Sequence, residues 1–202
     1  MKEEVEQQGQ GSGLDSGMVG GFEASDKPMP GKLIALDSTG KTHIGAFRTG
    51  AHVGGASNYS EALFSTTATF PTDNTIPQNT EGAEWLTLAY TPANANNTLR
   101  LSGLVQCMGG RPDGLVIAAI FVDNTANALA TFWRRTWSGT SSNEWTESFS
   151  FSYETTAGST SARTYKVRLG RTAGTLYVNS DAGIQFFGGT EVSHFKIEEF
   201  KA

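Results

Sequence analysis

Paired carboxylates are the residues of this chain whose spacing could support catalysis, because two acids placed across a glycosidic bond can cleave it by acid–base chemistry. Glu144 and Glu147 lie on either side of Trp145, and Glu198 directly precedes Glu199. The first pair comes immediately before a predicted strand, and the second lies in a charged terminus, where exposure to solvent is the simpler explanation. We therefore expect no enzymatic activity.

Histidine and cysteine offer no stronger catalytic or metal-binding signal. His43, His52 and His194 lack the spacing of metal ligands, and no Gly-x-Ser-x-Gly motif presents a serine nucleophile. We expect surface or interface histidines, no metal and no cofactor. The single cysteine, Cys107, cannot form an internal disulfide, which favours folding in a reducing compartment. We expect it to be a small buried apolar residue.

Aromatic and basic side chains gather between residues 132 and 145, which we predict to form a strand-loop-strand hairpin with an exposed polar loop at 138–143. Tryptophan rings stack on sugar rings and arginine binds carboxylates or hydroxyls, so this segment could form a glycan-binding patch. The candidate contact residues for such a glycan or receptor are Trp133, Arg135, Trp137, Asn143 and Trp145.

A structural role is the alternative for the same segment. Alternation along the strand places Phe132 and Arg134 on one face, with Trp133, Arg135 and Trp137 on the other. The tryptophans would then lie in the core or between subunits. The two arginines would form salt bridges across the hairpin with the carboxylates at positions 144 and 147.

Composition limits the functions that these residues can serve. A chain of 202 residues with 38% hydrophobic residues can form one domain with a core, plus an appendage. The net charge of -5 would repel phosphate backbones, so we expect no nucleic-acid binding. No apolar run is long enough to cross a bilayer, and the start of the chain is acidic where a signal peptide would be basic. We expect no membrane insertion. We expect the protein to assemble in a cytoplasm.

The periodicity of residues 81–202 predicts an all-β domain. Polar and aromatic residues alternate over 147–153 and again over 164–169, as in half-buried antiparallel strands. The run 115–122 is continuously apolar and should lie centrally, covered on both faces. Counting strands near 85–90, 99–101, 176–178 and 195–197, about seven or eight strands are separated by turns too short for crossover helices. We predict an antiparallel β-sandwich of the jelly-roll type.

Residues 1–80 lack the apolar residues for a core of their own. We predict a flexible anchoring arm at 1–30 and an extended Gly- and Ser-rich connector at 31–80, with one short strand that runs into a turn at 37–40. Such a segment would become ordered against a partner. The apolar residues of the arm that could attach it are Val5, Leu14, Met18, Val19 and Phe22.

A further observation concerns the segments 98–103, 117–121, 123–128, 157–168, 174–179, 186–190 and 197–199, in this order along the chain. Together they resemble the C-terminal domain of tailed-bacteriophage fibre proteins, and 32–41 is similar to the connector that precedes such domains. The resemblance implies a homotrimeric head or tail fibre located in the virion. Its arm would attach to other virion proteins, and its β-sandwich would form the tip, with cell-surface polysaccharide as a candidate ligand. No long repeat is present, so the fibre would be short. A free carbohydrate-binding module or lectin-like domain is the alternative.

Overall fold

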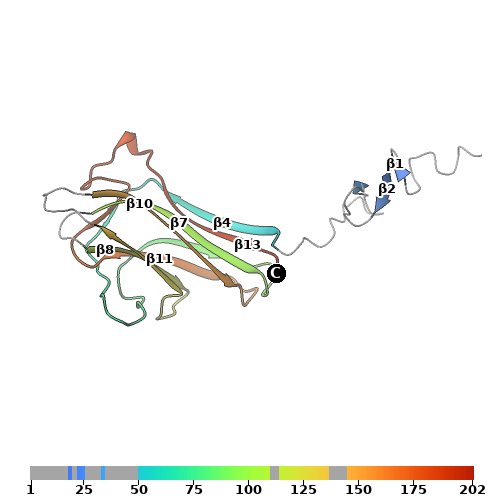
Figure 1. Ribbon diagram of the computed structural model, residues 1–202, viewed down its shortest axis with the longest axis horizontal. Helices are drawn as coiled ribbons and strands as arrows, with labels where there is room; N and C mark the ends of the chain where they lie inside the picture. The colour runs from blue at the N-terminus through green and yellow to red at the C-terminus, as the bar shows by residue number, and fades with distance from the viewer. Residues whose placement is uncertain (1–17, 20–21, 26–32, 35–49, 110–113, 137–144) are drawn as a thin grey trace, which may run out of the picture. The chain divides into compact units, whose positions relative to one another are not determined.

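The computed structural model describes the chain except for residues 1–17, 20–21, 26–32, 35–49, 110–113 and 137–144 (Figure 1). The chain divides into two compact units, residues 1–48 and 49–202. The described residues include no helix with the length and hydropathy of a membrane span.

The first unit contains a small sheet. Strands β1 (Met18–Val19) and β2 (Phe22–Ser25) pair antiparallel, and β3 (Leu33–Ile34) adds to β2 in parallel. The short strand predicted in the connector is therefore present as β3. Three residues of the proposed attachment set lie in β1 and β2, whereas Val5 and Leu14 lie outside the described residues. Attachment to a virion remains a prediction.

The described residues of the second unit form ten strands and one short 3-10 turn. These elements are β4 (His52–Ser60), β5 (Phe64–Thr66), β6 (Ala83–Tyr90), β7 (Thr98–Gly109), β8 (Gly114–Val122), β9 (Ala130–Thr136), β10 (Trp145–Thr156), β11 (Arg163–Arg171), β12 (Leu176–Val178), η1 (Phe187–Gly189) and β13 (Ser193–Phe200).

Two antiparallel sheets pack face to face, which confirms the predicted sandwich. One sheet has the order β4-β13-β7-β10, with β12 continuing the line of β13 along β7 and β5 beyond it. The other sheet has the order β6-β11-β8-β9. Figure 1 shows β4, β13 and β7 in one layer and β8 and β11 in the other. The chain passes repeatedly from one sheet to the other. The four strands β4, β13, β7 and β10 and the four strands of the other sheet therefore form a jelly roll, to which β5 and β12 are additions.

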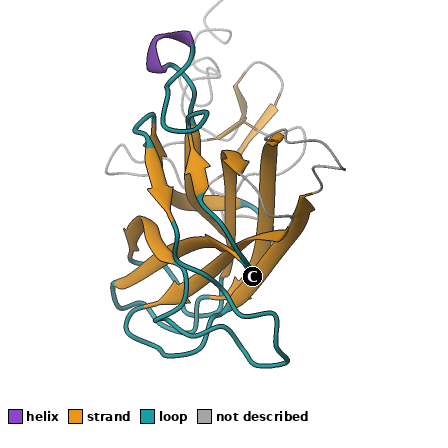
Figure 2. Ribbon diagram, turned by 90° about the vertical axis from the view of Figure 1, so that its left-hand side faces the viewer, coloured by secondary structure: helices purple, strands orange, loops and turns teal. Residues whose placement is uncertain are grey.

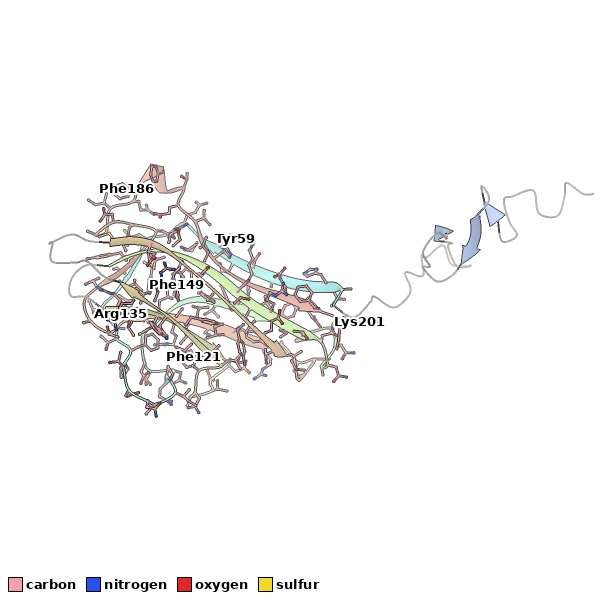
Figure 3. The ribbon with its side chains drawn as sticks, viewed as in Figure 1. Tyr59, Phe121, Arg135, Phe149, Phe186 and Lys201 are labelled. Carbon is pink, nitrogen blue, oxygen red and sulfur yellow. The ribbon has the colours of Figure 1, made fainter. Side chains whose placement is uncertain are left out.

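The alternating sequence patterns place the core between the sheets. On β10, Phe149 and Phe151 are buried while Ser148 and Ser150 are exposed, as the pattern predicts. Phe149 is labelled in Figure 3. Cys107 on β7 belongs to the same core, and burial raises the pKa of its thiol to about 12. The cysteine is therefore an uncharged core residue, as expected.

Strand β8 is buried on both faces, as its continuous apolar sequence predicts. Val116, Ala118 and Ile120 face the central core. Ile117 and Phe121 point to the outer side of the sheet, where Phe70 from the loop between β5 and β6 covers them. This loop is the reason that an outer strand face can be apolar.

The sandwich begins earlier than the predicted boundary at residue 81. Strand β4 pairs with β13, and β5 pairs with β12. Residues 52–60 and 64–66 of the predicted connector therefore belong to the sheets. Glycines hide β4 in the sequence. A Cβ on Gly55 would lie 2.5 Å from the Ile197 carbonyl oxygen, and one on Gly54 would lie 2.8 Å from the Tyr90 hydroxyl. Gly54 and Gly55 are therefore required because neighbouring atoms leave no space for a side chain, and not because the strand is flexible.

The jelly roll has two ends that carry different loops. At one end, which we call the entry end, the chain enters β4, and the Gly50 N–H donates to the Lys201 carbonyl (2.6 Å). The loops 91–97, 123–129 and 157–162 lie at this end because they join strand termini that pair there. The opposite end, the far end, carries the loop 179–192 with η1, drawn in purple in Figure 2.

Candidate functional site

Strand β9 presents Trp133 and Arg135 on the outer face of the smaller sheet. In the register with β8, Trp133 lies opposite Ile117, whose side chain points outward. Phe132 faces the other way and stacks on Phe151 with ring centroids 5.2 Å apart. The predicted division of faces is confirmed, but a core position for Trp133 is wrong in this chain, because 63% of the residue is exposed. Arg135 is exposed near the far end, away from Lys201 (Figure 3).

The predicted hairpin between β9 and β10 is wrong, because these strands belong to different sheets. Trp145 pairs with Gly109 of β7, so it is not a cross-strand neighbour of Trp133. One expected contact nevertheless forms: Arg134 makes an ion pair with Glu147 and so links the two sheets. Candidate residues Trp137 and Asn143 lie outside the described residues.

A groove of about 300 Å³ runs beside Trp133, between strands β8 and β9 and the loop that precedes β6. Its walls combine a tryptophan, apolar residues, three threonines and a single carboxylate. The lining residues are Phe70, Pro71, Thr72, Asp73, Thr75, Pro77, Leu115, Ile117, Thr131 and Trp133.

Asp73 is the only charged side chain among the described residues that line the groove. Its Oδ1 accepts hydrogen bonds from the Thr75 hydroxyl (2.6 Å) and from the Thr75 backbone N–H (2.9 Å). Both bonds lower the pKa of the Asp73 carboxyl, and the bond from the Thr75 hydroxyl has the larger effect. Asp73 is therefore an ionised hydrogen-bond acceptor at neutral pH. Asp73 is not among the residues predicted from the sequence, where its only signal is the Asp-x-Thr pattern of a side-chain-capped turn.

The loop wall of the groove is fixed to the sheet by Phe70. This ring fills a notch above two glycines: a Cβ on Gly82 would lie 2.2 Å from it, and a Cβ on Gly170 would lie 2.9 Å from it. Gly82 also has a left-handed φ of 60°. The Phe70 N–H donates to the Arg171 carbonyl (3.0 Å), and the Gly82 N–H donates to the Thr69 carbonyl (3.0 Å).

The last part of the same loop, before β6, is held by the connection between β8 and β9. The Ala128 N–H donates to the Pro77 carbonyl (2.9 Å), and Gln78 Nε2 donates to Asn127 Oδ1 (3.0 Å). Both walls of the groove are therefore attached to the sandwich, so the loop needs little further ordering when a ligand binds.

The other candidate carboxylates do not form a pair. Glu198 and Glu199 point to opposite faces of β13, and Glu144 lies outside the described residues. Exposure of Glu199 to solvent, the simpler expectation, is wrong: the residue is fully buried. It accepts hydrogen bonds from the Tyr90 hydroxyl (2.6 Å), the Ala93 N–H (2.9 Å) and Asn97 Nδ2 (2.6 Å). Burial alone would raise its pKa, but these bonds outweigh burial and lower it.

The described histidines contact aromatic rings. His52 lies 5.6 Å from the Phe200 ring, and His194 lies 5.5 Å from the Tyr59 ring, while His43 is outside the described residues. In the part of the chain that the structure describes, no three His, Cys, Asp or Glu residues are grouped so as to hold a metal ion.

No protein-family model matches the chain, and no curated protein is similar to it. Solved structures that resemble it include the EclA C-terminal domain, described as a sugar-binding protein, at 11% identity and a TM-score of 0.35, over 67% of this chain and 78% of that one. Another is the T=1 particle derived from infectious bursal virus, at 13% identity and a TM-score of 0.35, over 84% of this chain and 40% of that one. All of these TM-scores are below 0.5, so we draw no functional conclusion from the likeness.

Proposed function

We propose that the jelly roll binds neutral saccharides in the Trp133 groove and acts as the adhesive tip of a short bacteriophage fibre. The observation that carries the binding role is the exposure of Trp133 on the wall of a groove that also contains an ionised carboxylate, Asp73. A flat aromatic ring packs against the C–H face of a sugar, and a carboxylate accepts hydrogen bonds from its hydroxyls. Among the described residues no basic side chain lines the groove, which favours an uncharged sugar.

Binding without cleavage is part of the proposal. Hydrolysis of a glycosidic bond generally requires two carboxylates on opposite sides of the bond. The groove lining contains one, Asp73. A single carboxylate beside an aromatic platform suits recognition of the sugar.

The place of the sandwich in a fibre is supported by its exposed apolar side chains and by the resemblance of several segments to phage fibre proteins. Most of the exposed large apolar residues of the described sandwich lie toward the far end, opposite the point at which the chain enters β4. Among them are Tyr59, Leu63, Ile184, Phe186 and Phe187. A projecting domain presents this end to a surface or to neighbouring copies, and apolar patches are typical of such contacts.

The Trp133 groove can be tested by substitution in the full chain. A panel of neutral saccharides identifies a ligand, and titration calorimetry measures its affinity. We expect Trp133→Ala to weaken binding at least tenfold, because the stacking platform is lost. Asp73→Asn should weaken it too, since an amide is a poorer acceptor of hydroxyl hydrogen bonds than a carboxylate.

His52→Ala is the matched control, because His52 carries an exposed aromatic ring on the other sheet, at the entry end. It should bind as the wild type does. Equal losses in Trp133→Ala and His52→Ala, or binding that survives both groove substitutions, would show that the groove is not the saccharide site.

A further inference from the structure

A second, larger cavity lies at the entry end, remote in the fold from the exposed aromatic residues of the far end. Its volume is about 530 Å³, which is within the range of small-ligand sites. It is formed by the loop between β8 and β9, the end of β10 and the start of β11. The lining residues are Val122, Thr125, Ala126, Asn127, Ala128, Leu129, Thr155, Thr156, Ala157, Arg163 and Tyr165.

Of the described lining residues, Arg163 alone is charged, and its side chain is held from one side. Its Nε donates to Asp123 Oδ2 (3.0 Å), and the other oxygen of Asp123 accepts from the Thr164 N–H (2.8 Å). Asp123 itself has a left-handed φ of 54°, which turns the chain at the end of β8. The terminal guanidinium nitrogens of Arg163 have no acceptor among the described residues, so two parallel N–H donors remain for a ligand.

Further donors line the same cavity. Tyr165 follows Arg163 by two residues on β11 and therefore shares its strand face. Its ring is buried, and burial raises the pKa of its hydroxyl, which stays protonated. Asn127 also lines the cavity; its Oδ1 accepts from Gln78 Nε2 (3.0 Å), which leaves the N–H donors of its amide for a ligand.

From these contacts we infer that the entry-end cavity binds a carboxylate-bearing saccharide, such as a terminal hexuronic acid. The Arg163 guanidinium is held at its Nε by Asp123, and its two terminal nitrogens match the bidentate geometry of a ligand carboxylate. The threonines and Asn127 suit the ring hydroxyls, and the apolar part of the lining, with Tyr165, suits the C–H face of the sugar. Among the described residues the lining itself contains no carboxylate, and the oxygens of Asp123 already accept from Arg163 Nε and from the Thr164 N–H.

This site is chemically opposite to the Trp133 groove and does not rest on it. The groove has a carboxylate and no basic residue, whereas the cavity has an arginine and no carboxylate. The two sites should therefore select neutral and acidic sugars, respectively.

The test uses the full chain and two pairs of simple ligands: the methyl glycosides of glucuronic and galacturonic acid, and those of glucose and galactose. Titration calorimetry or ligand-observed NMR measures each affinity. We expect at least one uronate to bind, with its neutral partner at least tenfold weaker. Arg163→Gln should weaken uronate binding at least tenfold, and Trp133→Ala should leave it unchanged.

Two further variants keep the test decisive if Arg163→Gln does not fold. Asn127→Ala and Tyr165→Phe remove one donor each, and each should weaken uronate binding severalfold while thermal melting shows a folded domain. The proposal would be overturned by equal affinities for uronates and neutral glycosides, by the lack of any uronate binding at millimolar concentration, or by unchanged binding in the folded variants. Loss of neutral-sugar binding in Trp133→Ala alone would concern only the groove.

Discussion

At the scale of single residues, Glu199 shows what a sequence pattern omits. Its position beside Glu198 in a charged terminus predicts exposure, yet its hydrogen-bond partners come from residues more than 100 positions earlier in the chain. Gly54 is part of the same arrangement, because a Cβ there would crowd the Tyr90 hydroxyl. No local pattern encodes such partners, since they meet only after β4, β6 and β13 have packed together.

Glu199→Gln should destabilise the sandwich by about 2–3 kcal/mol at neutral pH, because charge-assisted hydrogen bonds in a buried site are lost. The folded-state pKa of Glu199 is lowered, so its contribution is complete above its unfolded pKa of about 4.3 and is lost as the pH falls through the folded-state pKa. Urea unfolding should thus show a gap between wild type and variant at pH 7 that narrows in acid.

Glu198→Gln provides the comparison, because Glu198 is on the same strand but on its opposite face. It should change the free energy of unfolding by less than about 0.5 kcal/mol. A gap between wild type and Glu199→Gln that stays constant down to pH 3 would contradict the role given to the ionised carboxylate.

At the scale of elements, the strands with clear periodicity could be predicted, and those that depend on distant packing could not. Alternation identified β10 and β11, and the continuous apolar run of β8 predicted a cover on both faces. Strand β4 was missed because glycines replace the side chains that would show a period. The hairpin between β9 and β10 was wrong because periodicity gives the faces of a strand but not its partner.

Gly170→Ala tests the element that forms the groove. The added methyl would lie 2.7 Å from the Ala68 carbonyl oxygen and 2.9 Å from the Phe70 ring, so the loop must move. We expect a loss of about 1–3 kcal/mol of stability, as for other overpacked sites, with faster hydrogen exchange over residues 68–82. Urea unfolding measures the loss of stability, and hydrogen-exchange mass spectrometry of the full chain measures the exchange over residues 68–82.

Gly158→Ala separates loop release from general destabilisation. Gly158 has a left-handed φ of 70° with open space around its Cα, so alanine there costs only backbone strain. Its exchange over 68–82 should follow the wild type. If both variants accelerate exchange equally, Phe70 and its notch do not hold the loop.

At the scale of the whole molecule, the sequence predicted an antiparallel sandwich but placed its start too late, and the jelly-roll strand order explains why. The first strand of the roll, β4, pairs with the last, β13, so neither edge can be recognised without the other. For the site, Trp133 could be named from its residue type, whereas Arg135, named in the same way, is not among the residues that line the groove. Asp73 and the entry-end cavity could not, because each is created by loops that meet across the fold.

The fibre proposal predicts that the full chain is a homotrimer. Size-exclusion chromatography with light scattering should give three times the 21.5 kDa of one chain. Trimers that resist dissociation in detergent would agree with the apolar side chains exposed toward the far end. A clean monomer that still binds saccharide would contradict the fibre and favour a free lectin-like module.

The loop between β5 and β6 touches both proposed sites. Residues 70–77 line the groove, and Pro77, Gln78 and Asn79 bond to the connection that lines the entry-end cavity. Any ligand that strengthens or weakens the attachment of this shared wall changes the free energy with which the other ligand binds. Thermodynamic linkage then requires the two affinities to shift by the same factor, so the sandwich would respond to a neutral and an acidic sugar together differently than to either alone.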